Sequence, residues 1–378
     1  MERENEQYGK LGVLGLKGCE DMIEKVDAYL CKWNVEAGGD GQSTVVHGTC
    51  PRFSTGEGKG VINESIRGYD LYILCDVFNY GVTYEMYGQE IPMGPDDHYQ
   101  DLKRIIMATN GKARRITVIM PMLYEGRQHR RFSRESLDCA VALQELTKMG
   151  VENLITYDAH DPRVQNAIPL QGFENVQATY QMISTLIRTV PDLVIDPKEL
   201  VVVSPDEGSM TRCIYYASVL GLDLGMFYKR RDYTRIVQGR NPIISHEFLG
   251  ESVEGKDVII VDDIISTGES MLSLSKDLKK RGARRIFVFA TFGLFADGVE
   301  GFTEAHQNGI LERVFTTNLI YRRPELLQSP WYTEVDMSKY IAYIINTLNC
   351  DQSISHLLDP VQRIKKVLED KRRGLFAL

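Results

Sequence analysis

The sequence has no long hydrophobic run. None of its apolar stretches approaches the roughly 18 residues that a helix needs to span a bilayer. The first residues, MERENEQYGK, are charged and polar, so they lack the apolar segment of a secretory signal. We therefore expect a protein that neither crosses a membrane nor enters the secretory route.

Cysteine is scarce and scattered. The chain has seven cysteines, an odd number, and no two of them form a CxxC pair. This usage is not typical of a disulfide framework or of a zinc site, and it indicates reduced thiols in the cytoplasm.

Basic residues are outnumbered by acidic ones. Lysines and arginines number 44 against 52 acids, which gives a net charge of −8. Such a chain does not attract nucleic acid by bulk electrostatics, so we expect no nucleic-acid partner.

The 378 residues do contain an alternation of short apolar segments and amphipathic segments of helix length. Hydrophobic residues make up 43% of the chain, enough to bury two cores of ordinary size. Continuous apolar strands joined by helices predict parallel sheets covered on both faces. We therefore predict an α/β fold with two domains, residues 1–172 and 173–378. Strands are expected at Leu71–Cys75, Ile116–Met120, Leu154–Tyr157, Leu200–Val203, Leu224–Tyr228, Val258–Val261 and Ile286–Ala290, and helices at Glu135–Met149, Val176–Arg188, Met271–Arg281 and Met337–Leu348.

Two stretches have the composition of loops. Residues 81–98 contain Gly, Pro and acids without clear periodicity, and residues 232–256 separate two predicted strands. A connection as long as the second one is often a lid over an active site.

The most specific motif is VIIVDDIISTGES, in which an apolar strand leads into two acids, Asp262 and Asp263. A carboxylate pair at the carboxyl end of a strand supplies acceptors for sugar hydroxyls. The turn that follows opens a helix, whose free N–H groups and dipole favour a phosphate. The simpler interpretation is that the acids only end the strand and that Ser266 or Thr267 caps the helix. The order of the elements favours a ribose-5-phosphate site formed by Asp262, Asp263, Ser266, Thr267, Gly268 and Ser270.

Two segments before this motif carry further candidate residues. Asp206 follows a predicted strand in VVVSPDEGSMTR, where it could bind a metal beside a polyphosphate or simply cap a helix. Lys229 and Arg231 stand at the start of the long loop. A basic triplet is usually a solvated turn, but at the base of a closing loop it can neutralise charge that develops on a transferring group.

The first half has a basic loop in an otherwise acidic chain. Arg127 and Gln128 begin the run RQHRR after a predicted strand. Arginine suits a triphosphate and stacks on adenine, and glutamine can read the edge of a base. His160 follows the next strand and is flanked by Asp158 and Asp161. A lone histidine is more often structural, but these acids favour a metal or nucleotide role.

Taken together, these segments resemble the ribose-phosphate diphosphokinase (phosphoribosyl-diphosphate synthetase) family, as a divergent bacterial-type member. The resemblance runs from about Arg52 to about Leu348, with six motifs in the same order: PRFSTGEGKGVINESIRGYDLYIL, PMLYEGRQHRRFSRE, DAHDPRVQ, SPDEGSMTR, YKRR and VDDIISTGES. It implies two phosphoribosyltransferase-like domains, each with a mainly parallel sheet flanked by helices. It also implies that the protein makes 5-phosphoribosyl 1-diphosphate and AMP from ATP and ribose 5-phosphate, for nucleotide biosynthesis.

The resemblance assigns a role to each matching position. Arg127 and Gln128 would bind ATP, and Phe53, Thr55 and Glu57 would lie near its adenine, presented by a neighbouring subunit of a dimer-based homo-oligomer, with a hexamer as one form. His160 and Asp206 would hold Mg²⁺. Lys229, Arg231 and His160 would be the catalytic residues, and the ribose-5-phosphate residues would be those named above.

The chain departs from the family pattern at several positions. His129 stands where an acid is usual, Ser209 replaces a glycine, Ser266 replaces a frequent aspartate and Glu269 occupies a usually small position. The chain is also longer near 81–98 and after Arg231. Two alternatives stay open at this stage: a nucleobase phosphoribosyltransferase, which has no use for RQHRR, and a non-catalytic regulatory subunit that resembles the synthetase.

Overall fold

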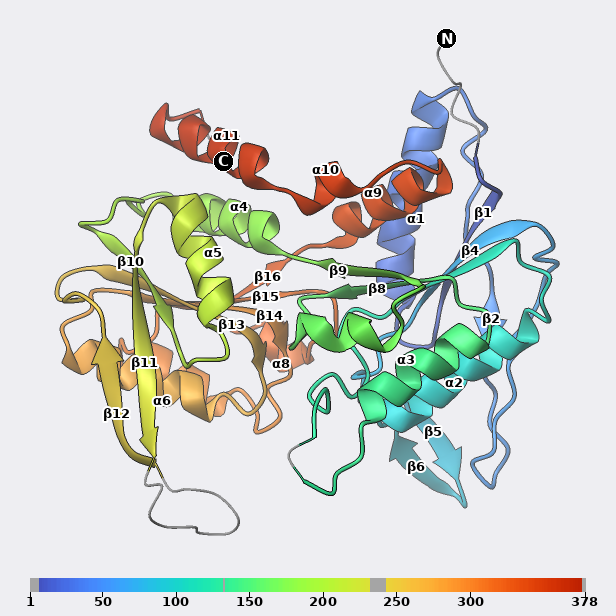
Figure 1. Cartoon of the computed structure of the whole chain (residues 1–378), viewed down its shortest axis with the longest axis horizontal. Helices are drawn as coiled ribbons and strands as arrows, with labels where there is room; N and C mark the ends of the chain where they lie inside the picture. Colours follow the sequence, from blue (N-terminus) through green and yellow to red (C-terminus); the bar gives the residue numbers. More distant parts are fainter. Residues whose placement is uncertain (1–6, 132, 232–242, 376–378) are drawn as a thin grey trace. The chain divides into compact units, whose positions relative to one another are not determined.

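The computed structural model describes residues 7–131, 133–231 and 243–375, without the side chains of 229–231 and 243–246 (Figure 1). The chain forms two compact units. The first contains Met1–Ala178, Asn318–Tyr321 and Asp336–Asp359, and the second contains Thr179–Thr317, Arg322–Val335 and Pro360–Leu378. The domain boundary at residue 172 stays a prediction.

The first unit is built on a parallel sheet with the strand order β1-β4-β7-β8-β9. Its strands are β1 (Lys10–Gly15), β4 (Tyr69–Leu74), β7 (Arg115–Ile119), β8 (Asn153–Tyr157) and β9 (Gly172–Val176). The inner strands are apolar on both faces because helices cover both sides, as the continuous hydrophobic runs predict.

Helices of the first unit come from both ends of the chain. Figure 1 shows α2 and α3 on one face of the sheet and α1 and α9 on the other. Trp33 of α1 stacks on Tyr343 of α9 with ring centroids 4.3 Å apart. The helical segments are α1 (Glu20–Glu36), α2 (Pro95–Ala108), α3 (Asp138–Lys148), η1 (Pro162–Ala167), α9 (Ser338–Asn349) and α10 (Ser355–Leu358). The unit also contains a short antiparallel pair of strands, β2 (Gly48–Thr49) and β3 (Val61–Ile62).

The expected loop at 81–98 is wrong, because most of it forms a hairpin and the start of α2. Strands β5 (Thr83–Met86) and β6 (Gln89–Pro92) pair antiparallel. The two turn residues, Tyr87 and Gly88, have φ values of 51° and 73°. A two-residue turn with both φ values positive matches the twist of the paired strands. The hairpin was missed because its strands are too short to show a clear alternation.

The second unit is built on a sheet with the strand order β12-β11-β10-β13-β14-β15-β16. All neighbours are parallel except β11 and β12, which pair antiparallel. The strands are β10 (Leu200–Ser204), β11 (Asp223–Arg231), β12 (Ile243–Leu249), β13 (Asp257–Ile265), β14 (Ile286–Gly293), β15 (Arg313–Thr317) and β16 (Tyr332–Val335). Strand β12 lies within the stretch 232–256, so the expectation of an uninterrupted loop there is wrong; residues 232–242 lie outside the described residues.

Helices cover both faces of the second sheet as well. Figure 1 shows α6 on the face opposite to α4 and α5. The helices are α4 (Thr179–Thr189), α5 (Met210–Leu220), α6 (Glu269–Lys280), α7 (Glu300–Gln307), α8 (Pro324–Leu327) and α11 (Val361–Arg372). The core under α6 and α7 contains Ile260, Val288, Leu278 and Phe302. This arrangement brings the carboxyl ends of β10 and β13 to one edge of the sheet.

The strands and helices that the sequence predicts are confirmed, with shifts of a few residues at their ends. The two α/β units with mainly parallel sheets confirm the predicted fold class. Among the described residues, no helix is long and apolar enough to cross a membrane. All seven cysteines are free thiols.

Candidate functional site

The second unit holds a small cavity at the carboxyl ends of two neighbouring parallel strands, β10 and β13. Its volume is about 140 Å³. The predicted site residues that line it are Asp206, Asp262, Ser266, Thr267, Gly268 and Ser270. Residues from two separate motifs therefore meet because their strands are neighbours in the sheet.

The turn between β13 and α6 opens directly into the helix. Gly268, rather than Ser266 or Thr267, occupies the N-cap position, with a φ of 90°. A Cβ at Gly268 would lie 2.3 Å from the ring of Phe302, so the position requires glycine for both reasons. The N-cap residue has no side chain to cap the helix. The first N–H groups of α6 thus begin beside the cavity, as an anion site at a helix N-terminus needs.

The two adjacent acids have different surroundings. Asp262 lines the cavity, whereas Asp263 is buried with 6% of its surface exposed and does not line it. Oδ1 of Asp262 accepts hydrogen bonds from the Ser209 hydroxyl at 2.5 Å and from the Asp263 N–H at 2.9 Å. Nη1 of Arg212 lies 4.0 Å from the same oxygen. Burial, and next the neighbouring Asp263, raise the pKa of Asp262 to about 8.

Asp206 organises the loop that leads into α5. Its Oδ1 accepts hydrogen bonds from the N–H groups of Gly208 at 2.9 Å and Ser209 at 3.2 Å. The hydroxyl of Ser204 donates to the carbonyl oxygen of Asp206 at 2.7 Å. These bonds orient the Asp206 carboxylate at the cavity that Asp262 also lines.

The donors in this cavity suit a hard cation. The carboxylates of Asp206 and Asp262 and the nearby hydroxyls present oxygen atoms, which magnesium prefers. The described residues contain no group of three His, Cys, Asp or Glu side chains that could hold a metal by themselves. Magnesium is usually held by one or two carboxylates together with substrate phosphates, so these residues fit such an ion.

In the first unit, the basic loop and the histidine segment follow neighbouring parallel strands, β7 and β8. Arg127 and Gln128 are exposed in the loop after β7, and His160 is exposed just after β8. Nε2 of His129 lies 3.4 Å from Oδ2 of Asp161, and the rings of His129 and His160 are 5.4 Å apart. The structure therefore brings the predicted nucleotide loop and His160 together at one sheet edge.

The charges at this edge are set by local partners. Hydrogen bonds from the Arg163 guanidinium lower the pKa of Asp161 to about 2. Burial lowers the pKa of His129. His129 stands where the family resemblance implies an acid, and its imidazole contacts the Asp161 carboxylate instead.

The segment Phe53–Glu57 forms a tight turn in the first unit, after β2. The N–H of Phe53 donates to the carbonyl of Glu57 at 2.7 Å, and the N–H of Gly56 donates to the carbonyl of Phe53 at 2.8 Å. The hydroxyl of Thr55 donates to the Glu57 carboxylate at 2.9 Å. Phe53 keeps 56% of its surface exposed, so its ring is available to a partner.

The structure does not bring all of the predicted site residues together. The side chains of Lys229 and Arg231, at the end of β11, lie outside the described residues. His160 belongs to the first unit and Asp206 to the second. The contacts of Ser209 and Arg212 with Asp262 were not predicted from the sequence. Both residues stand at the start of a predicted helix, directly after the strand that pairs with β13. This position in the sequence could have indicated that they contact Asp262.

Comparison with known proteins identifies both units. Residues 11–150 match the model of the N-terminal domain of ribose phosphate pyrophosphokinase, and residues 172–296 match the phosphoribosyl transferase domain. A ribose-phosphate pyrophosphokinase of Vibrio cholerae is 30% identical over 320 residues, covering 82% of this chain and 90% of the relative. One from Shewanella oneidensis is 30% identical over 308 residues, covering 80% of this chain and 88% of the relative.

A solved structure shows the same fold. The crystal structure of phosphoribosylpyrophosphate synthetase from Mycobacterium smegmatis aligns with a TM-score of 0.71. The alignment covers 90% of this chain and 98% of that structure, at 20% sequence identity. The likeness thus extends over both units.

Proposed function

The chain belongs to the ribose-phosphate pyrophosphokinase family, and on this basis we propose how its residues bind and activate the two substrates. The protein transfers the diphosphoryl group of ATP to the 1-hydroxyl of ribose 5-phosphate, which gives 5-phosphoribosyl 1-diphosphate and AMP for nucleotide biosynthesis. The observation that carries the site assignment is the cavity in the second unit, where Asp262, a hydroxyl-rich turn and a helix N-terminus meet.

Ribose 5-phosphate binds in this cavity. Asp262 accepts hydrogen bonds from the ribose hydroxyls, and Asp263 supports it from the buried side through its N–H. The 5-phosphate binds to the turn of Ser266, Thr267, Gly268 and Ser270, where hydroxyls and the N–H groups at the start of α6 converge.

ATP binds to residues of the first unit. Arg127 and Gln128 contact the nucleotide from the exposed basic loop, and the turn with Phe53, Thr55 and Glu57 receives the adenine. Arginine offers a planar fork of donors to phosphate oxygens, and the exposed ring of Phe53 offers a stacking surface.

In the reaction, the 1-hydroxyl oxygen of ribose attacks the β-phosphorus of ATP and loses its proton to solvent, and the bond from the β-phosphorus to the α-phosphate oxygen breaks as AMP leaves. No covalent intermediate with the protein is needed, because alignment and charge neutralisation account for the rate. Lys229 and Arg231 neutralise the diphosphoryl group as it moves. His160 and Asp206 are the residues that the family resemblance assigns to magnesium, which would supply positive charge to the triphosphate when bound.

The other two functions are not favoured. A nucleobase phosphoribosyltransferase would account only for the second unit, whereas the relatives cover both units and are named pyrophosphokinases. A non-catalytic subunit would not need the cavity residues that this chain keeps. We further propose a cytoplasmic homo-oligomer, in which the Phe53–Glu57 turn serves the site of a neighbouring subunit.

The test is an assay of AMP formation from ATP. We expect AMP only when ribose 5-phosphate is present, and a loss of about 100-fold or more in kcat/KM for Asp262→Asn. Asp277→Asn, a matched change on the outer part of α6, should behave like the wild type. AMP release that does not depend on ribose 5-phosphate would contradict the proposed function.

The subunit arrangement has its own test. At an ATP concentration far below the KM of the variant, Phe53→Ala subunits bind little ATP and turn over slowly. Mixed with impaired Asp262→Asn subunits, they should regain part of the activity, because a hybrid can combine one intact turn with one intact cavity. If no activity returns in a mixture that demonstrably exchanges subunits, each chain builds its own complete site.

A further inference from the structure

The Phe53–Glu57 turn, which we assign to adenine binding, packs against the β5–β6 hairpin. The N–H of Tyr87, at the hairpin tip, donates a hydrogen bond of 2.8 Å to the carbonyl oxygen of Ser54. A Cβ at Gly56 would lie 2.7 Å from Sδ of Met86, so the other side of the turn is in direct contact with β5. The two segments are packed together at both points.

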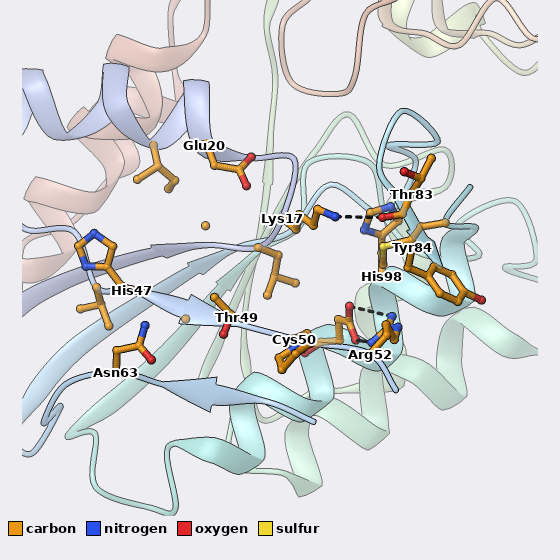
Figure 2. A pocket seen from close by; sticks show the side chains of 18 of the residues that line it. Lys17, Glu20, His47, Thr49, Cys50, Arg52, Asn63, Thr83, Tyr84 and His98 are labelled. Carbon is orange, nitrogen blue, oxygen red and sulfur yellow. Dashed lines mark hydrogen bonds and ion pairs between the residues drawn. The ribbon is translucent and has the colours of Figure 1, made fainter. Parts of the chain in front are cut away.

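The residue before the turn is held by the same hairpin and by α2. The Arg52 guanidinium makes a two-point ion pair with Asp101 of α2, with N–O distances of 2.5 and 2.9 Å. Its Cζ lies 5.2 Å from the centroid of the Tyr84 ring. The side chains of Arg52 and Asp101 are each only 8% exposed. Tyr84 and Arg52 both line a second cavity, which lies in the first unit, and Figure 2 shows them on the same side of it.

The hairpin is in turn fastened to the body of the first unit. Nζ of Lys17 donates to the carbonyl oxygen of Thr83 at 2.9 Å, as Figure 2 shows. The hydroxyl of Thr83 donates to the Glu90 carboxylate across the hairpin at 2.7 Å. The N–H of Met93 donates to the carbonyl of Val82 at 2.8 Å. The Lys17 contact joins the hairpin to the segment after β1, and the other two contacts hold the two strands of the hairpin together.

Phe53 differs from its neighbours in this arrangement. The backbone around it is bonded within the turn and to the hairpin, while more than half of its own surface is exposed. An aromatic ring on a fixed backbone loses little conformational freedom when a flat partner stacks on it. The hairpin thus supplies the fixed backbone that a stacking site for a base requires.

We propose that the β5–β6 hairpin is a positioning element for the adenine of ATP, in which Tyr84 and Met86 hold the turn that carries Phe53. The inference rests on the proposed role of this turn in ATP binding. It also gives a function to the segment near 81–98, where this chain is longer than the family pattern. The side chains of Tyr84 and Met86 act through the turn and do not touch the nucleotide.

The experiment measures steady-state kinetics of the full-length protein with Tyr84→Ala and with Met86→Ala. Each variant should raise the KM for ATP by about three- to tenfold, because part of the preorganisation of the turn is lost. The kcat and the KM for ribose 5-phosphate should stay within about twofold. Tyr84→Phe, which keeps the ring beside Arg52, should have the wild-type KM for ATP. Gln89→Ala, on the exposed part of β6, is the matched control.

Two further readouts separate positioning from general stability. Amide hydrogen exchange within Phe53–Glu57 should speed up in Tyr84→Ala and not in Gln89→Ala. A double variant of Phe53→Ala with Tyr84→Ala should be no worse in KM for ATP than Phe53→Ala alone, because the hairpin acts through that ring. Additive losses would contradict the inference.

The outcomes also distinguish the inference from the proposed function. If Phe53→Ala leaves the KM for ATP unchanged, the assignment of the turn to adenine is wrong, and the inference falls with it. If Phe53→Ala raises this KM while Tyr84→Ala and Met86→Ala only lower the melting temperature, the hairpin is structural and only the inference is wrong. An equal rise in the KM values of both substrates would also overturn it.

Discussion

The hydroxyl of Ser209 donates a hydrogen bond of 2.5 Å to Oδ1 of Asp262. The contact joins the start of α5 to the end of the neighbouring strand β13. The family resemblance implies a glycine at this position, and a glycine would have no hydroxyl to make this contact. A donated hydrogen bond favours the charged form of a carboxylate, and it therefore opposes the rise in the pKa of Asp262 that burial causes.

Removing this hydroxyl should weaken substrate binding in a pH-dependent way. In Ser209→Ala, the pKa of Asp262 should rise further, so a smaller fraction of the carboxylate is ionised at neutral pH. We expect the KM for ribose 5-phosphate to rise about two- to tenfold near pH 7 and to approach the wild-type value at higher pH. The measurement is a pH profile of this KM, with Ser273→Ala on the exposed part of α6 as control. A pH-independent effect would exclude this cause.

Asp262 should also make stability depend on pH. Its pKa in the folded protein, about 8, lies above the ordinary value, so the folded state holds this proton more tightly than the unfolded chain does. The contribution of Asp262 to stability is complete below the ordinary pKa and is lost as the pH rises through about 8. We therefore expect Asp262→Asn to raise the free energy of unfolding of the ligand-free protein by about 1–3 kcal/mol near pH 9, and less near pH 5. Denaturant titrations at the two pH values measure the difference.

The loop cations should act on the chemical step. Lys229→Ala or Arg231→Ala should lower kcat by about 100-fold or more, comparable to removing one preorganised donor to a transition state. The KM values should change much less, because the charge matters most while the diphosphoryl group moves. Near-normal turnover in both variants would show that the assignment is wrong.

Glu269 should have little effect on the binding of ribose 5-phosphate, although it directly follows Gly268 of the phosphate-binding turn. It is exposed in the first turn of α6, and it is absent from the residues that line the cavity. A carboxylate there gains about 0.3–1 kcal/mol from the helix dipole. Glu269→Gln should therefore change the KM for ribose 5-phosphate by less than about threefold, since only a screened charge is lost. A tenfold fall in this KM would mean that the carboxylate faces the phosphate and opposes its binding.

The buried pair of Asp70 and Arg115 should be critical for the stability of the first unit. Arg115 donates to Asp70 at 2.7 and 2.6 Å and to the carbonyl of Leu348 at 2.9 Å, and Asn349 donates to Asp70 at 3.0 Å. Asp70→Asn leaves a buried guanidinium unpaired and should cost about 3–5 kcal/mol of unfolding free energy. Asp21→Asn on the exposed surface of α1 is the control. If adding Arg115→Met recovers none of the loss, the unpaired charge is not its cause.

Local patterns in the sequence determined most of the elements and the ribose-phosphate turn. Strands such as β13 and helices such as α6 could be predicted because hydrophobic periodicity and the Thr-Gly turn act over a few neighbouring residues. The motif order also identified the family. The hairpin β5–β6 was missed because four-residue strands carry too little of this local signal.

Contacts between distant segments were decided only by the tertiary structure. Ser209 meets Asp262 because β10 and β13 are neighbours in the sheet, and no pattern in either motif specifies that order. Helix α9 returns to the first unit, where Leu348 and Asn349 complete the Asp70–Arg115 pair. The hairpin lies against Ser54 and Gly56 for the same kind of reason. Such contacts depend on which surfaces pack against each other in the folded chain. A local sequence pattern does not specify this packing, because the contacting residues lie far apart in the sequence.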